Sequence, residues 1–487
     1  MEMRVQHVDR LDGLIAGILK SAQVPGAAIA IVAEGRTAFA RGYGFRSLRP
    51  KQPMTADTVY PIASTTKPMN AMLLGMLVDE GKLAWDTPVQ NYFPGFRLHD
   101  PIASSRATLR DLVTMRTGLP RHDWAWVDSG LSRAELVKRL AHLELSADFR
   151  ERFQYSNLSV TAAGHIAEIV TGKRWEELIQ QRILAPLGMH ETTCHRPVRG
   201  KVTASYHENA RRKLVSAWRY GSQATAPSGG AVHSTVTDMA SWLLFHLAAG
   251  SDKKHRGLLK AETLRELHSP QVIVGKRALA SLSPDATYAL GWVVDYYRGH
   301  KRFGHTGYLH DVDSSTVFYP ELGVGLVSFL NKGGSISAEV VNQCAFDTLM
   351  DVPCEQVIVE RLAQYRTRLE KIRQRTAAVP RTAGTRPTHA SGAYVGTYEH
   401  AGYGAIEIRQ RGRKLILIRE SLKLDLKHWH YDAWVPESSD VWSVHQVHPF
   451  DGASLVQFHV DARGAIGSLS FALDPEVAPI RFARRQV

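Results

Sequence analysis

The segment YPIASTTKPMNAML, residues 60–73, places Ser64 and Lys67 three residues apart at the start of an apolar run with helical spacing. Residues at this spacing share one face of a helix. A serine hydroxyl is a weak nucleophile near neutral pH and needs a base, and burial would lower the pKa of a lysine enough to make it one. The pair alone carries little weight, because Ser251 and Lys254 repeat the spacing in a polar, glycine-adjacent stretch.

A second motif follows in FQYSNLSVTAAGHIAEIVTG, residues 153–172, where Tyr155-Ser156-Asn157 stands directly before an apolar helix pattern. A tyrosine in this place could exchange protons with a substrate, and the Asn157 amide could hold the lysine. Tyr155 could equally be a core residue whose hydroxyl is satisfied locally.

A third motif, His305-Thr306-Gly307, is predicted at the head of a strand in KRFGHTGYLHDVDSSTVFYP, residues 301–320. A glycine there would let an acyl substrate lie along the backbone, and the amide that follows could donate to an oxyanion. The motif could also be a simple turn. Separate structural explanations, however, do not account for the order Ser-x-x-Lys, Tyr-x-Asn, Thr-Gly.

The order of hydrophobic patterns predicts an α+β fold. Two strands are expected around the turn at Glu34-Gly35-Arg36, mostly helical segments up to about Ala249, and strands again over 288–297 and 314–330. Such an order indicates an antiparallel sheet with helices packed against it. The chain opens on an amphipathic helix that presents one apolar face, Val8, Leu11, Ile15 and Ile18.

The C-terminal part has a different pattern. A second amphipathic helix ends in the Pro/Gly/Thr-rich linker AAVPRTAGTRPTHASG, residues 377–392. Beyond it, short strand patterns at 405–419, 442–450, 454–461 and 466–473 predict a small all-β barrel whose interior is filled by aromatics such as Trp429, Tyr431 and Trp434. We expect three parts: a main domain over 1–350, a basic helix with its linker over 351–390, and the barrel over 391–487.

The bulk composition excludes several classes of function. The formal net charge of +13 is largely local: basic residues crowd the segment 361–386, and two shorter basic clusters lie at 211–213 and 253–256. This predicts a solvated basic face, and no nucleic-acid motif accompanies it. No apolar run approaches the roughly 20 residues of a membrane span, and the three cysteines lack the spacings of a zinc site or a disulfide framework. We expect a cytoplasmic protein with no membrane span, no nucleic-acid partner, no metal and no cofactor.

The three motifs together resemble the serine β-lactamase and penicillin-binding-protein superfamily, and in particular its class C-type serine hydrolases, which include D-aminopeptidases and carboxylesterases. Segments 24–44, 107–123 and 227–243 are also similar to that family, so the resemblance covers about residues 8–349. It implies an antiparallel sheet flanked by helices plus an all-helical subdomain. Residues 392–418 and 426–434 resemble the lipocalin-like β-barrel found behind such domains, which implies cover for the cleft or support for a homo-oligomer.

The resemblance also implies roles for the motif residues. Ser64 would be the nucleophile, Lys67 its base, and Tyr155 the group that protonates the leaving group and later activates water. Asn157 would orient Lys67 and the substrate amide, Thr306 would hydrogen-bond a substrate carboxylate or carbonyl, and Gly307 would let the acyl group lie along the strand. The backbone amides of Ser64 and Tyr308 would form the oxyanion hole.

His305 departs from the pattern of dedicated β-lactamases, which carry lysine at this position. An imidazole binds a substrate carboxylate as a cation only when it is protonated. The substitution favours an amidase, D-peptidase or esterase that acts on a small molecule or short peptide, with weak β-lactam hydrolysis. The alternatives are a penicillin-binding-type protein that acylates with little turnover and a non-catalytic assembly or binding protein.

Overall fold

The computed structural model describes residues 3–195, 197, 200–208, 213–216, 227–248, 257–275, 285–309, 311–334, 336–377, 380–437 and 455–486. Ser251 and Lys254, and the strand predicted at 442–450, lie outside these ranges.

The main domain is built on a nine-stranded antiparallel sheet in the order β3-β2-β1-β13-β12-β11-β10-β9-β8, which confirms the predicted α+β class. The N-terminal hairpin pairs with the last strand of the domain through β1 and β13. Every residue of β1 is buried, because helices cover both faces of the sheet there. The strands are β1 (Gly26–Ala33), β2 (Arg36–Leu48), β3 (Lys51–Pro53), β8 (Val272–Ile273), β9 (Thr287–Tyr288), β10 (Val293–Tyr297), β11 (His300–Leu309), β12 (Val312–Tyr319) and β13 (Val324–Leu330).

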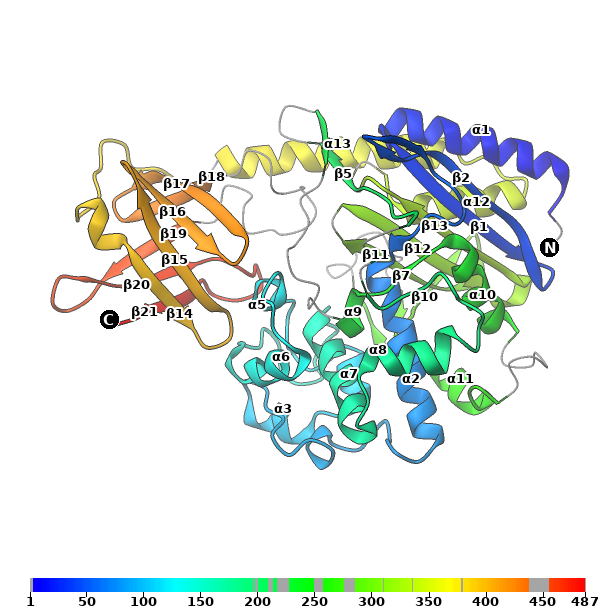
Figure 1. Cartoon of the computed structure of the whole chain (residues 1–487), viewed down its shortest axis with the longest axis horizontal. Helices are drawn as coiled ribbons and strands as arrows, with labels where there is room; N and C mark the ends of the chain where they lie inside the picture. Colours follow the sequence, from blue (N-terminus) through cyan, green and yellow to red (C-terminus); the bar gives the residue numbers. More distant parts are fainter. Residues whose placement is uncertain are drawn as a thin grey trace.

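Two layers of helix enclose the sheet (Figure 1). On the outer face, α1 (Val5–Ala22) and α12 (Ala338–Leu349) share one apolar core with the sheet. On the inner face, α2 (Lys67–Asp79) and α10 (Val236–Leu247) belong to a second core that continues into the helical subdomain. The predicted apolar face of the first helix is confirmed for Leu11, Ile15 and Ile18, which are buried, while Val8 is half-buried.

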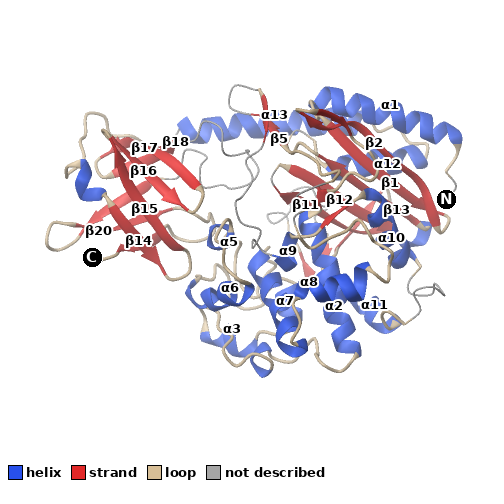
Figure 2. Cartoon of the chain, in the orientation of Figure 1, coloured by secondary structure: helices blue, strands red, loops and turns tan. Residues whose placement is uncertain are grey.

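The helical subdomain lies below the sheet in Figures 1 and 2. It is formed by α3 (Pro101–Arg106), α4 (Leu109–Val113), α5 (Asp123–Trp126), α6 (Arg133–Arg139), α7 (Asn157–Thr171) and α8 (Trp175–Ile179). Short elements complete the main domain: β4 (Tyr60–Pro61), β5 (Tyr206–Glu208), β6 (Leu214–Ser216), β7 (His233–Ser234), α9 (Pro227–Gly230) and α11 (Ala261–Leu267).

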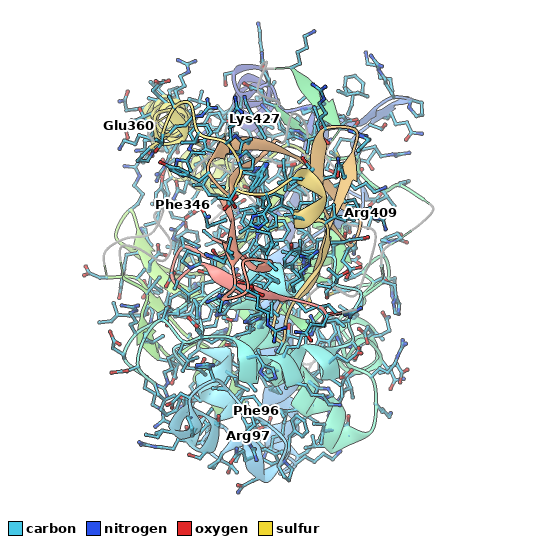
Figure 3. The ribbon with its side chains drawn as sticks, turned by 90° about the vertical axis from the view of Figure 1, so that its left-hand side faces the viewer. Phe96, Arg97, Phe346, Glu360, Arg409 and Lys427 are labelled. Carbon is cyan, nitrogen blue, oxygen red and sulfur yellow. The ribbon has the colours of Figure 1, made fainter. Side chains whose placement is uncertain are left out.

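The C-terminal unit is a closed barrel of eight antiparallel strands that neighbour one another in chain order, the up-and-down arrangement of lipocalins. Helix α13 (Glu355–Ala377) leads from the sheet domain towards it, as Figure 1 shows. Figure 3 looks onto the barrel, with Arg409 and Lys427 above the helical subdomain that carries Phe96 and Arg97. The strands are β14 (Gly396–His400), β15 (Gly404–Arg411), β16 (Lys414–Arg419), β17 (Leu422–His430), β18 (Ala433–Glu437), β19 (Val456–Val460), β20 (Ile466–Phe471) and β21 (Ile480–Arg484).

Two local expectations need correction. The helical run that starts at Ser64 begins as a 3-10 turn over Ala63–Thr66, and the α-helix α2 starts only at Lys67. Residues 305–307 lie in the second half of β11 and not at its head, because the strand starts directly after the tight turn at Arg298-Gly299.

The expectation for the barrel aromatics is right for Trp434 and wrong for Tyr431. Trp434 is buried against Tyr394 and Phe458, whereas Tyr431 is 53% exposed in the turn between β17 and β18. Trp429 lies against the linker, where its Nε1 donates to the Pro380 carbonyl at 3.0 Å.

The packing of α1 predicts a stability difference between two isoleucines. Ile15 is 1% exposed in the outer core, and Ile102 is 60% exposed on α3. We expect Ile15→Ala to lower the free energy of unfolding by about 2–5 kcal/mol and Ile102→Ala to change it by less than about 0.5 kcal/mol. Denaturant unfolding followed by circular dichroism measures both, and equal losses would contradict the packing of α1.

Candidate active site

Ser64, Lys67 and Tyr155 meet at one point between the sheet and the helical subdomain. The Lys67 Nζ lies 2.9 Å from the Ser64 Oγ, and the Tyr155 hydroxyl donates to the same Oγ at 2.7 Å. The 3-10 turn carries Ser64, the first residue of α2 is Lys67, and Tyr155 stands two residues before α7. Two motifs about ninety residues apart in the chain therefore converge on one hydroxyl oxygen.

The Lys67 Nζ is buried among oxygens. Besides Ser64 it contacts the Asn157 Oδ1 at 2.7 Å and the Gly229 carbonyl at 2.8 Å. These two oxygens can only accept, so a neutral amine would donate its two N–H groups to them and leave its lone pair for the hydroxyl proton of Ser64. The hydrogen-bond geometry is therefore complete for a neutral lysine that acts as a base.

The surroundings favour that neutral form. Burial, with a further contribution from the nearby Arg121 guanidinium, holds the pKa of Lys67 well below its ordinary value of 10.5, while Asp123 acts in the opposite direction. A desolvated ammonium loses the hydration that stabilises its charge, so the amine is favoured.

Tyr155 is set up as a proton donor. Burial raises the pKa of its phenol to about 12, so the hydroxyl remains protonated at neutral pH. The Arg121 guanidinium lies 5.0 Å from the centre of its ring and the Lys67 Nζ lies 4.7 Å from it. The guanidinium, and Lys67 once it has taken the Ser64 proton, would stabilise a phenolate formed after the phenolic proton is given away.

The orientation of the Asn157 amide is fixed by a second partner. Its Nδ2 donates to the Asp123 Oδ1 at 3.2 Å, which leaves Oδ1 for Lys67. Asp123 also accepts from the Arg121 Nε at 2.7 Å. Asn157 is the first residue of α7, whose N-terminus is capped by the side chain of Ser156.

Gly307 brings β11 against the nucleophile. A Cβ at this position would stand 3.0 Å from the Ser64 amide nitrogen and 2.2 Å from the Ile62 carbonyl oxygen, so only glycine allows the approach. The Ser314 Oγ, on the neighbouring strand, donates to the same Ile62 carbonyl at 2.8 Å. Ala63, directly before the nucleophile, has a φ of 50°, a strained conformation for a residue with a Cβ.

The predicted oxyanion hole, formed by the amides of Ser64 and Tyr308, stays a prediction. Tyr308 is the residue after Gly307, on which a Cβ would stand 3.0 Å from the Ser64 amide nitrogen. Thr306 is partly exposed next to it and stays a predicted contact for the acyl group.

His305 is buried in a neutral form. Its Nδ1 lies 2.6 Å from the Thr306 carbonyl, which can only accept, so Nδ1 carries the proton and Nε2 accepts from the Tyr288 hydroxyl at 3.1 Å. Burial is the main cause that lowers its pKa to about 3, and a positive charge on Lys67 acts in the same direction. At neutral pH this residue therefore offers no cation to a substrate.

Sequence reasoning missed five residues of the site: Arg121, Asp123, Gly229, Tyr288 and Ser314. Arg121 and Asp123 end the segment 107–123 that supported the family resemblance, and Gly229 lies in the segment 227–243. Those two resemblances were the available signals. Nothing in the local pattern marks Tyr288 or Ser314, because pairing between strands brings them to the site.

Two other kinds of site have no counterpart among the described residues. Within that part of the chain, no group of three or more His, Cys, Asp or Glu side chains is arranged to hold a metal ion. Among the same residues, no helix combines the length and the apolar character needed to cross a bilayer.

Comparison with known proteins places this geometry in a family. The model described as Beta-lactamase matches residues 11–343, and one described as a domain of unknown function (DUF3471) matches residues 380–484. The solved structure of the octameric penicillin-binding protein homologue from Pyrococcus abyssi is 21% identical, covers 98% of this chain and 100% of its own, and has a TM-score of 0.65. At that identity the likeness shows the fold alone.

Two of the similar known proteins are named as hydrolases. The unguisins hydrolase ungD' of Aspergillus campestris is 26% identical over 82% of this chain and 78% of its own length. The unguisins hydrolase ungD of Aspergillus violaceofuscus is 27% identical over 80% and 74%. Protein flp of Staphylococcus aureus is 25% identical over 70% and 68%. Because the family model spans most of the chain, including all three motifs, the chain belongs to the Beta-lactamase family.

Proposed function

We propose that the protein is a serine hydrolase that forms an acyl-enzyme on Ser64 and cleaves small amides, short peptides, including D-amino-acid peptides, or esters. The observation that carries the proposal is that the Lys67 nitrogen lies 2.9 Å from the Ser64 Oγ and contacts two oxygens that can only accept, so a neutral amine would have its lone pair left for the Ser64 proton. The two fungal relatives are named as hydrolases, which supports catalysis over a purely structural role.

Acylation would proceed with both protons accounted for. The Ser64 Oγ attacks the carbonyl carbon as its proton moves to Lys67, and the carbonyl oxygen becomes an oxyanion held by backbone amides. When the bond to the leaving group breaks, Tyr155 gives it the phenolic proton. This leaves an ammonium beside a phenolate, a charge pair that the contact of Lys67 with the Tyr155 ring favours.

Deacylation would return both groups to their starting forms. The phenolate takes a proton from water as the water oxygen attacks the acyl carbon. Collapse of the second intermediate breaks the ester bond, and Lys67 gives its proton back to the Ser64 oxygen. The net reaction adds one water to the acyl compound and leaves the enzyme unchanged.

The substrate class follows from His305. Because this imidazole is buried and neutral, the fixed cation that a lysine would offer to a β-lactam carboxylate is missing at this position. We infer that uncharged amides and esters are preferred and that β-lactam hydrolysis is weak. A cytoplasmic location and a homo-oligomeric state stay predictions; the likeness to the Pyrococcus abyssi protein, which is described as octameric, supports the second.

Removal of the nucleophile tests the proposal. We expect Ser64→Ala to lower turnover of p-nitrophenyl esters and D-amino-acid anilides by at least about a thousandfold, and Ser251→Ala, in the second Ser-x-x-Lys of the chain, to leave it unchanged. Steady-state kinetics with intact-mass detection of adducts measures both. Unchanged turnover in Ser64→Ala would refute the mechanism. An adduct on the wild-type protein without turnover would favour the penicillin-binding type.

The pH dependence tests the state of Lys67. Activity needs the neutral amine, so it rises as the pH passes the lysine pKa. Arg121 lowers that pKa and Asp123 raises it, so Arg121→Gln should move the acid limb of kcat/KM to higher pH and Asp123→Asn should move it to lower pH. The acid limb of kcat/KM is measured by ester hydrolysis from about pH 5 to about pH 10. If both variants shift this limb in the same direction, Lys67 is not the group that titrates there.

The neutral state of His305 gives a separate prediction. With its pKa lowered to about 3, His305 does not change its charge near its ordinary value of about 6.5. We expect KM for a carboxylate-bearing substrate to show the same pH profile in wild type and in His305→Gln. An inflection near pH 6.5 that disappears in the variant would show that His305 binds substrate as a cation.

A further inference from the structure

The segment from Arg121 to Asp128 lies between the catalytic groups and the C-terminal barrel. Towards the site it supplies Arg121, stacked on Tyr155, and Asp123, bonded to the Asn157 amide. Towards the barrel it is held by hydrogen bonds along most of its length. The segment therefore contacts both the catalytic groups and the barrel.

The first barrel anchor is Asp474. It is 4% exposed, and its Oδ2 accepts from the His122 backbone N–H at 2.7 Å while its Oδ1 accepts from the Glu476 N–H at 2.9 Å. His122 adopts a left-handed φ of 43°, which is unfavourable for a residue with a Cβ. The barrel carboxylate satisfies the backbone of the one residue that stands between Arg121 and Asp123.

The second anchor is Tyr403, which is fully buried. The His122 Nε2 lies 2.7 Å from the Glu144 carbonyl, so it carries the ring proton. The His122 Nδ1 is then an acceptor, and the Tyr403 hydroxyl donates to it at 2.7 Å. Asp474 and Tyr403 together fix both the backbone and the ring of His122.

The far end of the segment is held in the same way. Arg419, 7% exposed, donates to the Val127 carbonyl at 3.0 Å and to the Trp124 carbonyl, and the Ser421 N–H donates to Asp128 at 3.1 Å. The two Arg419 bonds add side-chain donors to main-chain carbonyls at the end of the short helix α5, and Ser421 binds the Asp128 carboxylate.

A separate contact reaches the Tyr155 motif itself. The Gln154 Nε2, one residue before the tyrosine, donates to the Glu476 carboxylate of the barrel at 2.8 Å. The barrel thus contacts the main domain at two places next to Tyr155: at Gln154, its neighbour in the chain, and at the segment whose Arg121 lies over its ring.

We propose that Asp474 and Tyr403 are positioning residues for catalysis, and that the barrel of each chain completes its own active site by setting Arg121 and Asp123 against Tyr155 and Asn157. This inference rests on the proposed function of Ser64. The charged and titratable groups that face Lys67 are Arg121 and Asp123 from the anchored segment, Tyr155 before α7, and His305 from β11. Loss of an anchor displaces the first two.

Displacement has a signed consequence. Burial and Arg121 are the two larger causes that lower the pKa of Lys67, and Asp123 is the smaller opposing one. When the segment moves away, water and the loss of Arg121 both raise that pKa, so the acid limb of the rate profile moves to higher pH. A barrel that only stabilises the fold would leave the limb in place.

The test uses the full-length protein and a fluorophosphonate probe that labels active serines. Asp474→Asn leaves one acceptor oxygen for two N–H donors, and Tyr403→Phe removes only the hydroxyl. Asp432→Asn and Tyr398→Phe are matched controls, because both residues are buried in the C-terminal unit and lie away from the segment. Asp432 accepts from the Thr388 N–H of the linker, and the Tyr398 hydroxyl donates to the Tyr394 carbonyl.

We expect Asp474→Asn and Tyr403→Phe to slow labelling by the probe and to lower kcat by about tenfold or more, because small displacements of catalytic groups are costly. We also expect both variants to move the acid limb of the rate profile to higher pH. The two control variants should keep kcat within about twofold of wild type, even where they lose as much Tm as the anchor variants. If all four variants show the same kcat, the same labelling rate and the same acid limb of the rate profile, this inference is overturned and the proposed function is not. Absence of labelling in wild type would overturn the proposed function, and this inference with it.

Discussion

The site depends on one buried nitrogen. The Lys67 Nζ is removed from water, and burial of an amine is tolerated only when its hydrogen bonds are made. The partners come from three separate parts of the fold: the 3-10 turn with Ser64, the start of α7 with Asn157, and α9 with Gly229. The sheet and the helical subdomain must pack together for the nitrogen to find all three.

The same convergence explains the tolerance for strain at Ala63 and the glycine at position 307. The left-handed φ of Ala63 turns the Ser64 side chain into the space between Lys67 and Tyr155. Gly307 lets β11 come close enough to hold that turn, with Ser314 bonded to the Ile62 carbonyl from the next strand. A side chain at position 307 would therefore push β11 away from the turn that carries Ser64.

Much of this fold could be predicted from the sequence, because the information is periodic and local. Leu11, Ile15 and Ile18 define a helix face, the turn at Glu34-Gly35 defines a hairpin, and the barrel follows from repeated short strands. The motif residues could be named because their spacing is itself local. The neutral state of His305 could not be foreseen, since Tyr288 reaches it only through strand pairing. The role of the segment 121–128 depends on Asp474, over three hundred residues away in the chain.

The central claim is that Ser64, and no other serine, carries the acyl group. The most direct measurement is peptide mapping by tandem mass spectrometry after brief exposure of the wild-type protein to a p-nitrophenyl ester near neutral pH and a rapid acid quench, which stops deacylation. We expect one acyl adduct, located on Ser64 in the peptide that contains Lys67. An adduct on another serine, with Ser64 unmodified, would contradict it.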